Sequence, residues 1–220
     1  MKILAIDTSS NICSTALLED NNLIDENNLD NGRTHSENLM PLVKELLERN
    51  NIKLSEIDLI AVSCGPGSFT GIRIGIASVK AMAEIHNIPV AEVTSLETLA
   101  ANDNTDRNKI TIIDARNNQV YCGVFDKEYN LLEDYMADDI NEIIAKISKY
   151  SKSSIIGNGA VLHKELLSKI EGVIFVENNN QSAYKVGQIG YKKFLSKDLK
   201  NADTVMPIYL RKSQAERMKK

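Results

Sequence analysis

The sequence predicts an α/β protein of two lobes, each a mixed β-sheet flanked by helices. Three observations support this prediction. The chain has 220 residues and is 43% apolar, which suffices for two compact lobes of about 100 residues each. Strand and helix patterns follow one order in residues 1–101 and nearly repeat it in residues 102–220. An aspartate, Asp7 or Asp114, ends the first predicted strand of each half.

The first half opens with three predicted strands, KILAID, CSTALLE and LIDENN, which polar turns join into a meander. Two further strands are predicted at residues 58–63 and at IPVAEV. Between them the segment GPGSFTG turns the chain into a helix that runs to about His86. The predicted order of this half is βββαβαβ once the helix before residue 58 is included.

That earlier helix is predicted over residues 38–50, because apolar side chains recur there at helical spacing: Leu39, Val43, Leu46 and Leu47. Thr34 and Glu37 have the spacing of a capping box, but a start at Thr34 places Pro41 inside the helix, where it removes a hydrogen bond. The start at Asn38 is therefore preferred, and a longer, kinked helix is the alternative.

After a polar linker at residues 101–109, the second half predicts three strands (KITIID, QVYCGVFD, YNLLEDY) and a helix at 139–149. A strand and turn at SSIIGNGA, a helix to Ile170, the strand VIFVE and a helix at 183–195 complete it. Two such halves describe a ribonuclease-H-like duplication, the plan shared by actin, Hsp70 and sugar kinases (the ASKHA fold). The predicted lobes are residues 1–101 and 102–220, with the last segment either staying in the second lobe or returning to the first.

Charge and cysteine content restrict the function classes. The formal net charge is −4, whereas a protein that grips a nucleic-acid backbone unaided usually carries a basic excess. The three cysteines have no CxxC spacing, which argues against a disulfide framework or a zinc ribbon. No apolar run has the length of a signal peptide or a membrane span, so a soluble cytoplasmic protein is expected.

Turns after the first strand of each half are candidate nucleotide-binding sites. DTSS offers Asp7 and Ser9, and the corresponding turn in the second half begins at Asp114. Arg116 stands where nucleotide-binding relatives usually have glycine. The segment GNGA, which contains Gly157 and Gly159, resembles the adenosine-side turn of the superfamily. Two interpretations stay open: the acids face nucleotide phosphates, or they cap turns. The candidate set is Asp7, Ser9, Asp114, Gly157 and Gly159.

The GPGSFTG segment has the form GxGxxxG between a strand and a helix, with Glu92 about 25 residues further on, which permits a dinucleotide-binding interpretation. Such a fingerprint normally lies in the first βαβ unit, and this one follows a meander. It is not a Walker A loop, because no Lys-Ser/Thr follows the last glycine. The alternative is a sharp strand-to-helix turn in which Ser68 or Thr70 caps the helix.

The helix that follows has two packable stripes. One is apolar (Ile72, Ile76, Val79, Ala83), and the other consists mostly of small residues (Gly71, Gly75, Ser78, Met82); a narrow polar stripe holds Arg73, Lys80 and Glu84. A surface helix needs only one buried stripe, so the second stripe either contacts another protein or is covered inside its own lobe. Gly75 in a helix interior costs up to about 1 kcal/mol, which close packing against a second helix would offset.

Catalytic chemistry is not apparent in the sequence. The three histidines, His35, His86 and His163, have no HxxxH or HExxH spacing, and no GxSxG motif is present. No catalytic residue and no metal ligand is therefore assigned. The terminal segment RKSQAERMKK is basic and is either a solvated end or a contact for a partner or for RNA phosphate.

These motifs together resemble the TsaB family, also called YeaZ. DTSS, HSENLMP, GPGSFTGIRIG, DAR, GNG and PIYLR occur in the family's order over the whole length, and GPGSFTG is the most specific of them. The resemblance implies a two-lobed actin-like fold and a non-catalytic subunit of the complex that makes threonylcarbamoyladenosine beside the tRNA anticodon. It implies a catalytic partner of TsaD type, an ATPase of TsaE type, tRNA contact only through the complex, and a homodimer as a further state.

The resemblance places the partner contact on the two helices of the first lobe. The residues expected there are Leu39, Leu42, Val43, Leu46, Gly71, Arg73, Gly75, Ser78 and Met82. A bulky charged residue at Gly75 or Ser78 is expected to abolish partner binding and leave the fold intact. No cofactor is expected, and ATP only at an interface within the complex. An actin-like ATP-dependent kinase, a glycoprotease-like enzyme and a dinucleotide-binding module are the competing hypotheses.

Overall fold

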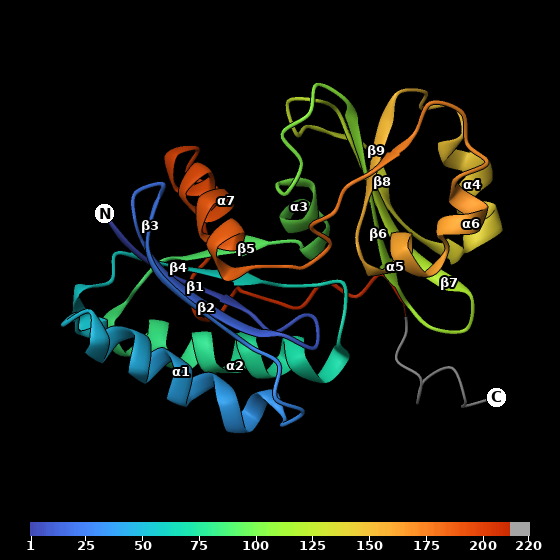
Figure 1. Ribbon diagram of the computed structural model, residues 1–220. Coiled ribbons are helices and arrows are strands. Elements are labelled where there is room, and N and C mark those ends of the chain that lie inside the picture. The colour runs from blue at the N-terminus through green and yellow to red at the C-terminus, as the bar shows by residue number, and fades with distance from the viewer. Residues whose placement is uncertain (212–220) are drawn as a thin grey trace. The chain divides into compact units, whose positions relative to one another are not determined.

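The computed structural model describes residues 1–211, which form two compact units (Figure 1). The first unit comprises residues 1–98 and 181–208, and the second comprises residues 99–180 and 209–211. The lobes predicted at 1–101 and 102–220 therefore differ from these units in the segment 181–208. That segment lies with the first unit because it covers an apolar face of the first sheet.

The first sheet has the strand order β3-β2-β1-β4-β5. Strands β1, β2 and β3 form an antiparallel meander, and β4 and β5 run parallel to β1. The bounds are β1 Lys2–Asp7, β2 Cys13–Glu19, β3 Asn22–Leu29, β4 Leu59–Ser63 and β5 Val90–Val93. Each of the strands β1, β2 and β4 has at least five consecutive buried residues, as the continuous apolar runs predict.

The second sheet repeats this arrangement, with the order β10-β9-β6-β7-β8. Its first three strands are again an antiparallel meander, and β9 is parallel to β6. The bounds are β6 Asn108–Asp114, β7 Gln119–Phe125, β8 Leu131–Asp139, β9 Ser153–Ile156 and β10 Ile174–Phe175. The predicted duplication is confirmed, although β10 is shorter than the predicted strand VIFVE.

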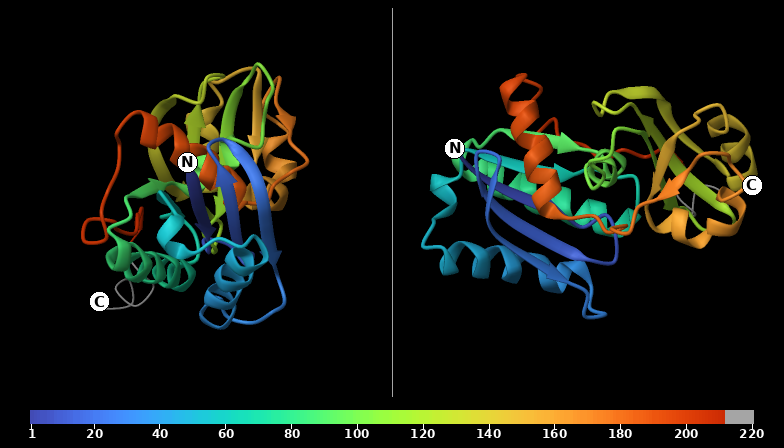
Figure 2. Two further views of the ribbon diagram at one scale, coloured as in Figure 1. Left: turned by 90° about the vertical axis from the view of Figure 1, so that its left-hand side faces the viewer. Right: turned by 45° about the horizontal axis from the view of Figure 1, so that its top comes forward.

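Helices α1 (His35–Arg49) and α2 (Phe69–His86) lie side by side on one face of the first sheet (Figure 1 and Figure 2). The preferred start of α1 at Asn38 is wrong, because the helix begins one turn earlier. Glu37 accepts hydrogen bonds from the backbone N–H and the hydroxyl of Thr34, at 3.1 and 2.8 Å. These bonds fix the first turn, and Pro41 is tolerated inside the helix.

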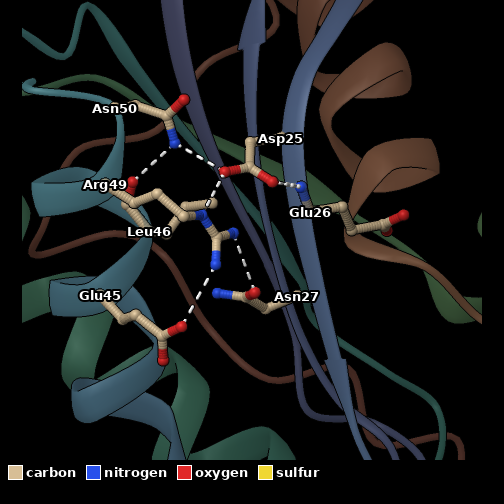
Figure 3. A network of polar contacts seen from close by, with 7 residues as sticks. All are labelled: Asp25, Glu26, Asn27, Glu45, Leu46, Arg49 and Asn50. Carbon is tan, nitrogen blue, oxygen red and sulfur yellow. Dashed lines mark hydrogen bonds and ion pairs between the residues drawn. The ribbon is translucent and has the colours of Figure 1, made fainter.

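The last turn of α1 is tied to β3 by a polar network (Figure 3). Arg49 donates to Asp25 at 2.7 Å, to Asn27 at 3.0 Å and to Glu45 at 3.2 Å. Asn50 donates to the same Asp25 carboxylate at 2.8 Å. The network fixes α1 against the edge strand of the sheet.

Helix α7 (Ala183–Leu195) covers the opposite face of the first sheet (Figure 1). Two glycines allow the close approach. A Cβ atom at Gly187 would lie 2.4 Å from Leu18 Cδ1, and one at Gly190 would lie 2.5 Å from the Cβ of Ala61. The first unit is therefore a three-layer αβα sandwich whose second helical layer comes from a distant part of the sequence.

The remaining helices are short. α3 (Ser95–Ala100) was not predicted, although Thr94 and Glu97 form a capping box in which each side chain bonds the other's backbone N–H, at 3.0 and 2.7 Å. In the second unit, α4 (Ile140–Ile147), α5 (Asn158–Leu162) and α6 (Lys164–Leu167) contribute to one apolar core with the sheet. A 3₁₀ turn spans Leu54–Glu56.

Candidate functional site

In the turn after β1, the Asp7 carboxylate bonds to residues of the turn itself. One carboxylate oxygen of Asp7 accepts the backbone N–H of Ser9 at 2.8 Å and the Ser9 hydroxyl at 2.7 Å. Asp7 is 1% exposed and Ser9 2% exposed. Burial raises the pKa of the Asp7 carboxyl above its ordinary value of 3.8, and the hydrogen bonds from Ser9 oppose that rise. Asp7 therefore caps this turn.

The GPGSFTG segment closes over the same turn. Ser68 donates its backbone N–H to the carbonyl oxygen of Ser9 at 2.8 Å, and a Cβ atom at Gly67 would lie 2.2 Å from that oxygen. The Ser68 hydroxyl accepts the backbone N–H of Gly71 at 3.2 Å. The prediction of a sharp turn with a serine cap is confirmed, and the glycine spacing is explained by packing between two turns.

The corresponding turn in the second unit is built in the same way. The Asp114 carboxylate accepts the backbone N–H of Arg116 at 2.8 Å. Arg116, Asn117 and Asn118 all have positive φ, from 53 to 63°. Arg116 therefore adopts the left-handed backbone conformation that glycine adopts more easily, at a cost of about 1–2 kcal/mol.

The GNG segment packs against the end of β6. A Cβ atom at Gly157 would lie 2.2 Å from the carbonyl oxygen of Ile112, and one at Gly159 would lie 3.0 Å from the backbone nitrogen of Asp114. Asn158 accepts the Asp114 backbone N–H at 2.9 Å. All five candidate nucleotide-binding residues thus hold turns within their own unit, and nucleotide binding by them stays a prediction.

Most residues predicted to contact a partner lie inside the first unit. Seven of them, on α1 and α2, are buried in its core: Leu39, Leu42, Val43, Leu46, Gly71, Gly75 and Met82. Arg73 is exposed and Ser78 half-buried. The apolar stripe of α2 and three residues of the second stripe, Gly71, Gly75 and Met82, face inward, because the helix lies on the sheet and against α1 at once.

Thr8 explains the two glycines. Its hydroxyl donates to the carbonyl oxygen of Gly71 at 2.8 Å. A Cβ atom at Gly75 would lie 2.4 Å from the Thr8 hydroxyl oxygen, and one at Gly71 would lie 2.1 Å from the Thr8 carbonyl oxygen. The close neighbour expected from Gly75 is therefore the end of β1 and not a second protein.

A third face of α2 points away from the unit, and we call it the outer α2 face. It consists of Arg73, Ile74, Ala77, Ser78, Ala81, Glu84 and Ile85. Ile85 is 68% exposed, and Met40 on the neighbouring helix α1 is 45% exposed. The guanidinium of Arg73 stacks on the ring of Phe69 at 3.8 Å. Ala77, Ala81 and Ile85 were missed, although their spacing of four residues marks them as one stripe.

The described residues contain no group of three His, Cys, Asp or Glu side chains placed to hold a metal ion. The three cysteines are buried, and burial raises the pKa of Cys13 to about 11 and the pKa values of Cys64 and Cys122 to about 12. Each thiol is therefore protonated at neutral pH. Among residues 1–211 no helix is long and apolar enough to span a bilayer.

The PIYLR segment is divided between the two units. Ile208 donates its backbone N–H to the carbonyl oxygen of Cys64 at 2.8 Å within the first unit. Arg211 donates to the carbonyl oxygen of Ala115 at 3.4 Å within the second. The rest of the predicted basic tail, residues 212–220, lies outside the described part of the chain.

The chain matches the family model described as "TsaD: tRNA N6-adenosine threonylcarbamoyltransferase" over residues 29–219. The Bacillus subtilis protein named tRNA threonylcarbamoyladenosine biosynthesis protein TsaB is 35% identical over 98% of this chain and 96% of its own length. The chain belongs to the TsaB (YeaZ) family. A Haemophilus influenzae protein of the same name is 26% identical over 94% of this chain and 81% of its own length. Membership gives the chain a role in the biosynthesis of threonylcarbamoyladenosine on tRNA.

Solved structures agree with this membership. YeaZ from Pseudomonas aeruginosa has a TM-score of 0.82 at 25% identity, over 95% of this chain and 99% of that one. An activator of 2-hydroxyisocaproyl-CoA dehydratase from Clostridium difficile, solved with bound ADPNP, has a TM-score of 0.53 at 11% identity, over 91% of this chain and 99% of that one. The second likeness shows the fold alone, and the predicted actin-like class is confirmed.

Proposed function

We propose that this chain is a non-catalytic subunit of a tRNA threonylcarbamoyladenosine complex and binds a TsaD-type catalytic subunit through the outer α2 face. The observation that carries the proposal is that face itself. Ala77, Ser78 and Ala81 are small, and they lie between the apolar side chains of Ile74 and Ile85. Small residues let another helix approach closely, and apolar flanks stabilise the contact by burial.

The neighbouring surface of α1 extends this face. Met40 and Pro41 are exposed on α1, and α1 packs beside α2. Lys44 and Glu48 form an exposed ion pair further along the same side of α1, at 3.7 Å. An apolar centre with a charged rim is the usual anatomy of a protein interface. A TsaE-type ATPase joins the same assembly in our proposal, and tRNA is contacted only within the complex.

The decisive experiment replaces exposed alanines of α2 by arginine. Ala77→Arg and Ala81→Arg, tested singly, are expected to abolish co-purification with the organism's own TsaD-type protein, because each inserts a long charged side chain into the contact. Their far-UV circular dichroism and melting temperature are expected to equal those of the original chain, since both positions face solvent. Co-purification that survives both substitutions would exclude this interface.

Ala145→Arg is the matched control, because Ala145 is an exposed alanine of α4 in the second unit. It carries the same change and is expected to leave binding intact. Gly75 is unsuitable for this test, because a side chain there meets Thr8 and changes the fold. Ser78 remains suitable. A modification assay with TsaD-type and TsaE-type proteins, with and without this chain, tests the role of the whole subunit.

A titration with ATP and Mg²⁺ tests the enzyme alternative. We expect no saturable heat of binding from the isolated chain, because Asp7, Ser9 and the two glycines of GNG already serve turn packing. Tight binding would favour an ATP-dependent kinase of the actin-like class over a scaffold.

A further inference from the structure

The segment that covers the second face of the first sheet is strongly basic. Between residues 183 and 200 the sequence has five lysines and one aspartate, a local excess of four positive charges in a chain of net charge −4. The lysines are Lys185, Lys192, Lys193, Lys197 and Lys200. This concentration of charge lies on α7 and the turn after it, on the side of the sheet opposite α1 and α2 (Figure 1).

Aromatic and basic side chains alternate in register along α7. Tyr184-Lys185 recurs as Tyr191-Lys192 after seven residues, which is two helical turns to within about 20°. The two pairs therefore lie on one stripe, about 10 Å apart along the helix. Lys192 is exposed, and Tyr184, Lys185 and Tyr191 are half-buried. Lys185 and Lys192 lie on the side of α7 away from the sheet. The rings of Tyr184 and Tyr191 lie at its flank and pack against the core between α7 and the sheet.

The row of lysines continues beyond the end of the helix, where Lys197 is exposed in the turn that follows. A row of cations along one side of a helix can follow the phosphates of a nucleic-acid backbone. The surface is therefore suited to bind a polyanion.

Three carboxylates near α7 already have partners within the unit. Glu26 accepts from the Ser182 hydroxyl at 2.6 Å and from the Tyr184 backbone N–H at 3.0 Å. Glu97 pairs with Lys193 at 3.5 Å, and Asp20 pairs with the N-terminal amine at 3.1 Å. Burial, and next the charge of Lys192, lower the pKa of Lys185, and Glu26 opposes that shift. Lys185 also donates from its Nζ to Gln188 Oε1 at 3.2 Å.

We propose that the outer surface of α7, formed by Lys185 and Lys192 with Lys197 beyond it, binds the phosphate backbone of tRNA. The inference rests on the proposed function, because a tRNA is the substrate of the assembly that the chain joins. It goes beyond that function by giving the two faces of the first unit different partners. The outer α2 face contacts protein, and the α7 surface contacts RNA.

The test is fluorescence anisotropy with a labelled, unmodified tRNA transcript, using the full chain alone and together with the TsaD-type protein. Lys192→Glu/Lys197→Glu is expected to weaken binding by about tenfold and to reduce the salt slope by about two, one for each lost phosphate contact. Lys192→Arg/Lys197→Arg is expected to keep both quantities. Circular dichroism confirms that each variant is folded.

Lys164→Glu/Lys169→Glu in the second unit is the control, because it makes the same change in charge at two other exposed lysines. The proposal is overturned if the α7 variant loses no more affinity than this control, or if the original chain binds no tRNA in either form. It is also overturned if the α7 variant keeps tRNA affinity and loses the TsaE-type protein, since the surface would then bind protein. Co-purification with the TsaD-type protein is a separate measurement, so failure of the proposed function is seen independently.

Discussion

Asp7 illustrates how one buried carboxyl serves local structure. It ends β1, caps the turn through Ser9 and is 1% exposed. Burial raises its pKa above 3.8, so the folded protein holds the Asp7 proton more tightly than the unfolded chain does. The ionised carboxylate therefore lowers stability, and the loss grows as pH rises from 3.8 toward the folded-state pKa.

Asp7→Asn removes this pH dependence in our prediction. Asparagine keeps the oxygen that accepts from Ser9 and carries no charge. The free energy of unfolding of the variant, relative to the original chain, is expected to rise as pH increases from 3.8, measured by urea denaturation between pH 3 and 8. Parallel curves for the two proteins over that range would refute the assignment.

Asp25→Asn is the control of opposite sign. The hydrogen bond from Arg49 is the first cause that lowers the pKa of Asp25, so the ionised Asp25 stabilises the fold above pH 3.8 (Figure 3). That contribution is lost as pH falls through the folded-state pKa. The Asp25 variant is therefore expected to have a lower free energy of unfolding than the original chain at pH 7 and an equal one at strongly acidic pH.

At the scale of the element, α1 shows two local rules in conflict. The capping box of Thr34 and Glu37 favours the longer helix, and Pro41 opposes it. The longer helix forms although its added residues, 35–37, bury no apolar side chain, because the Thr34–Glu37 hydrogen bonds hold that turn. These capping bonds outweigh the single hydrogen bond that proline removes.

Pro41→Ala is expected to stabilise the protein by about 1–3 kcal/mol, since it restores a backbone donor within α1 and removes the ring's clash. Pro41 is exposed, so no core packing is lost. A rise in the urea midpoint with an unchanged slope would show this. A fall in the midpoint would mean that the ring of Pro41 stabilises the helix by packing, although the residue is exposed.

The strands and the large helices could be predicted from the sequence because each is a long apolar pattern with a clear period. Helix α3 was not predicted, because six residues are too few to show a helical period. The capping box of Thr94 and Glu97 is the sequence feature that indicates it. Whether the second stripe of α2 contacts another protein or is covered within its own lobe stayed open for a different reason. Periodicity shows which residues share a stripe, but Thr8 and α1, which cover two of the stripes, are brought there only by the tertiary fold.

At the scale of the whole molecule, the first unit is discontinuous in sequence. Its second helical layer, α7, lies on the far side of residues 99–180 in the chain. Ile3, Leu18 and Leu59 are fully buried in the cluster that contains Ala183 and Val186 of α7. Without α7 these side chains would face water.

A fragment of residues 1–101 is therefore expected to lack a cooperative urea transition and to bind a dye such as ANS, because one face of its sheet is bare. A rearranged chain that joins residues 181–208 through a flexible linker to residues 1–98 is expected to recover the transition. The opposite result, cooperative unfolding of the fragment alone, would show that α7 is dispensable for the first unit.

The position of α7 also has a consequence for how the protein is made. A ribosome adding 5–20 residues per second takes about 6 to 22 s to pass from residue 98 to residue 208. During that interval the first sheet emerges with half its apolar cover missing, whereas residues 99–180 emerge as one continuous stretch. The half of the protein that is synthesised first therefore receives its last helix late, and for those seconds its uncovered sheet face is open to aggregation.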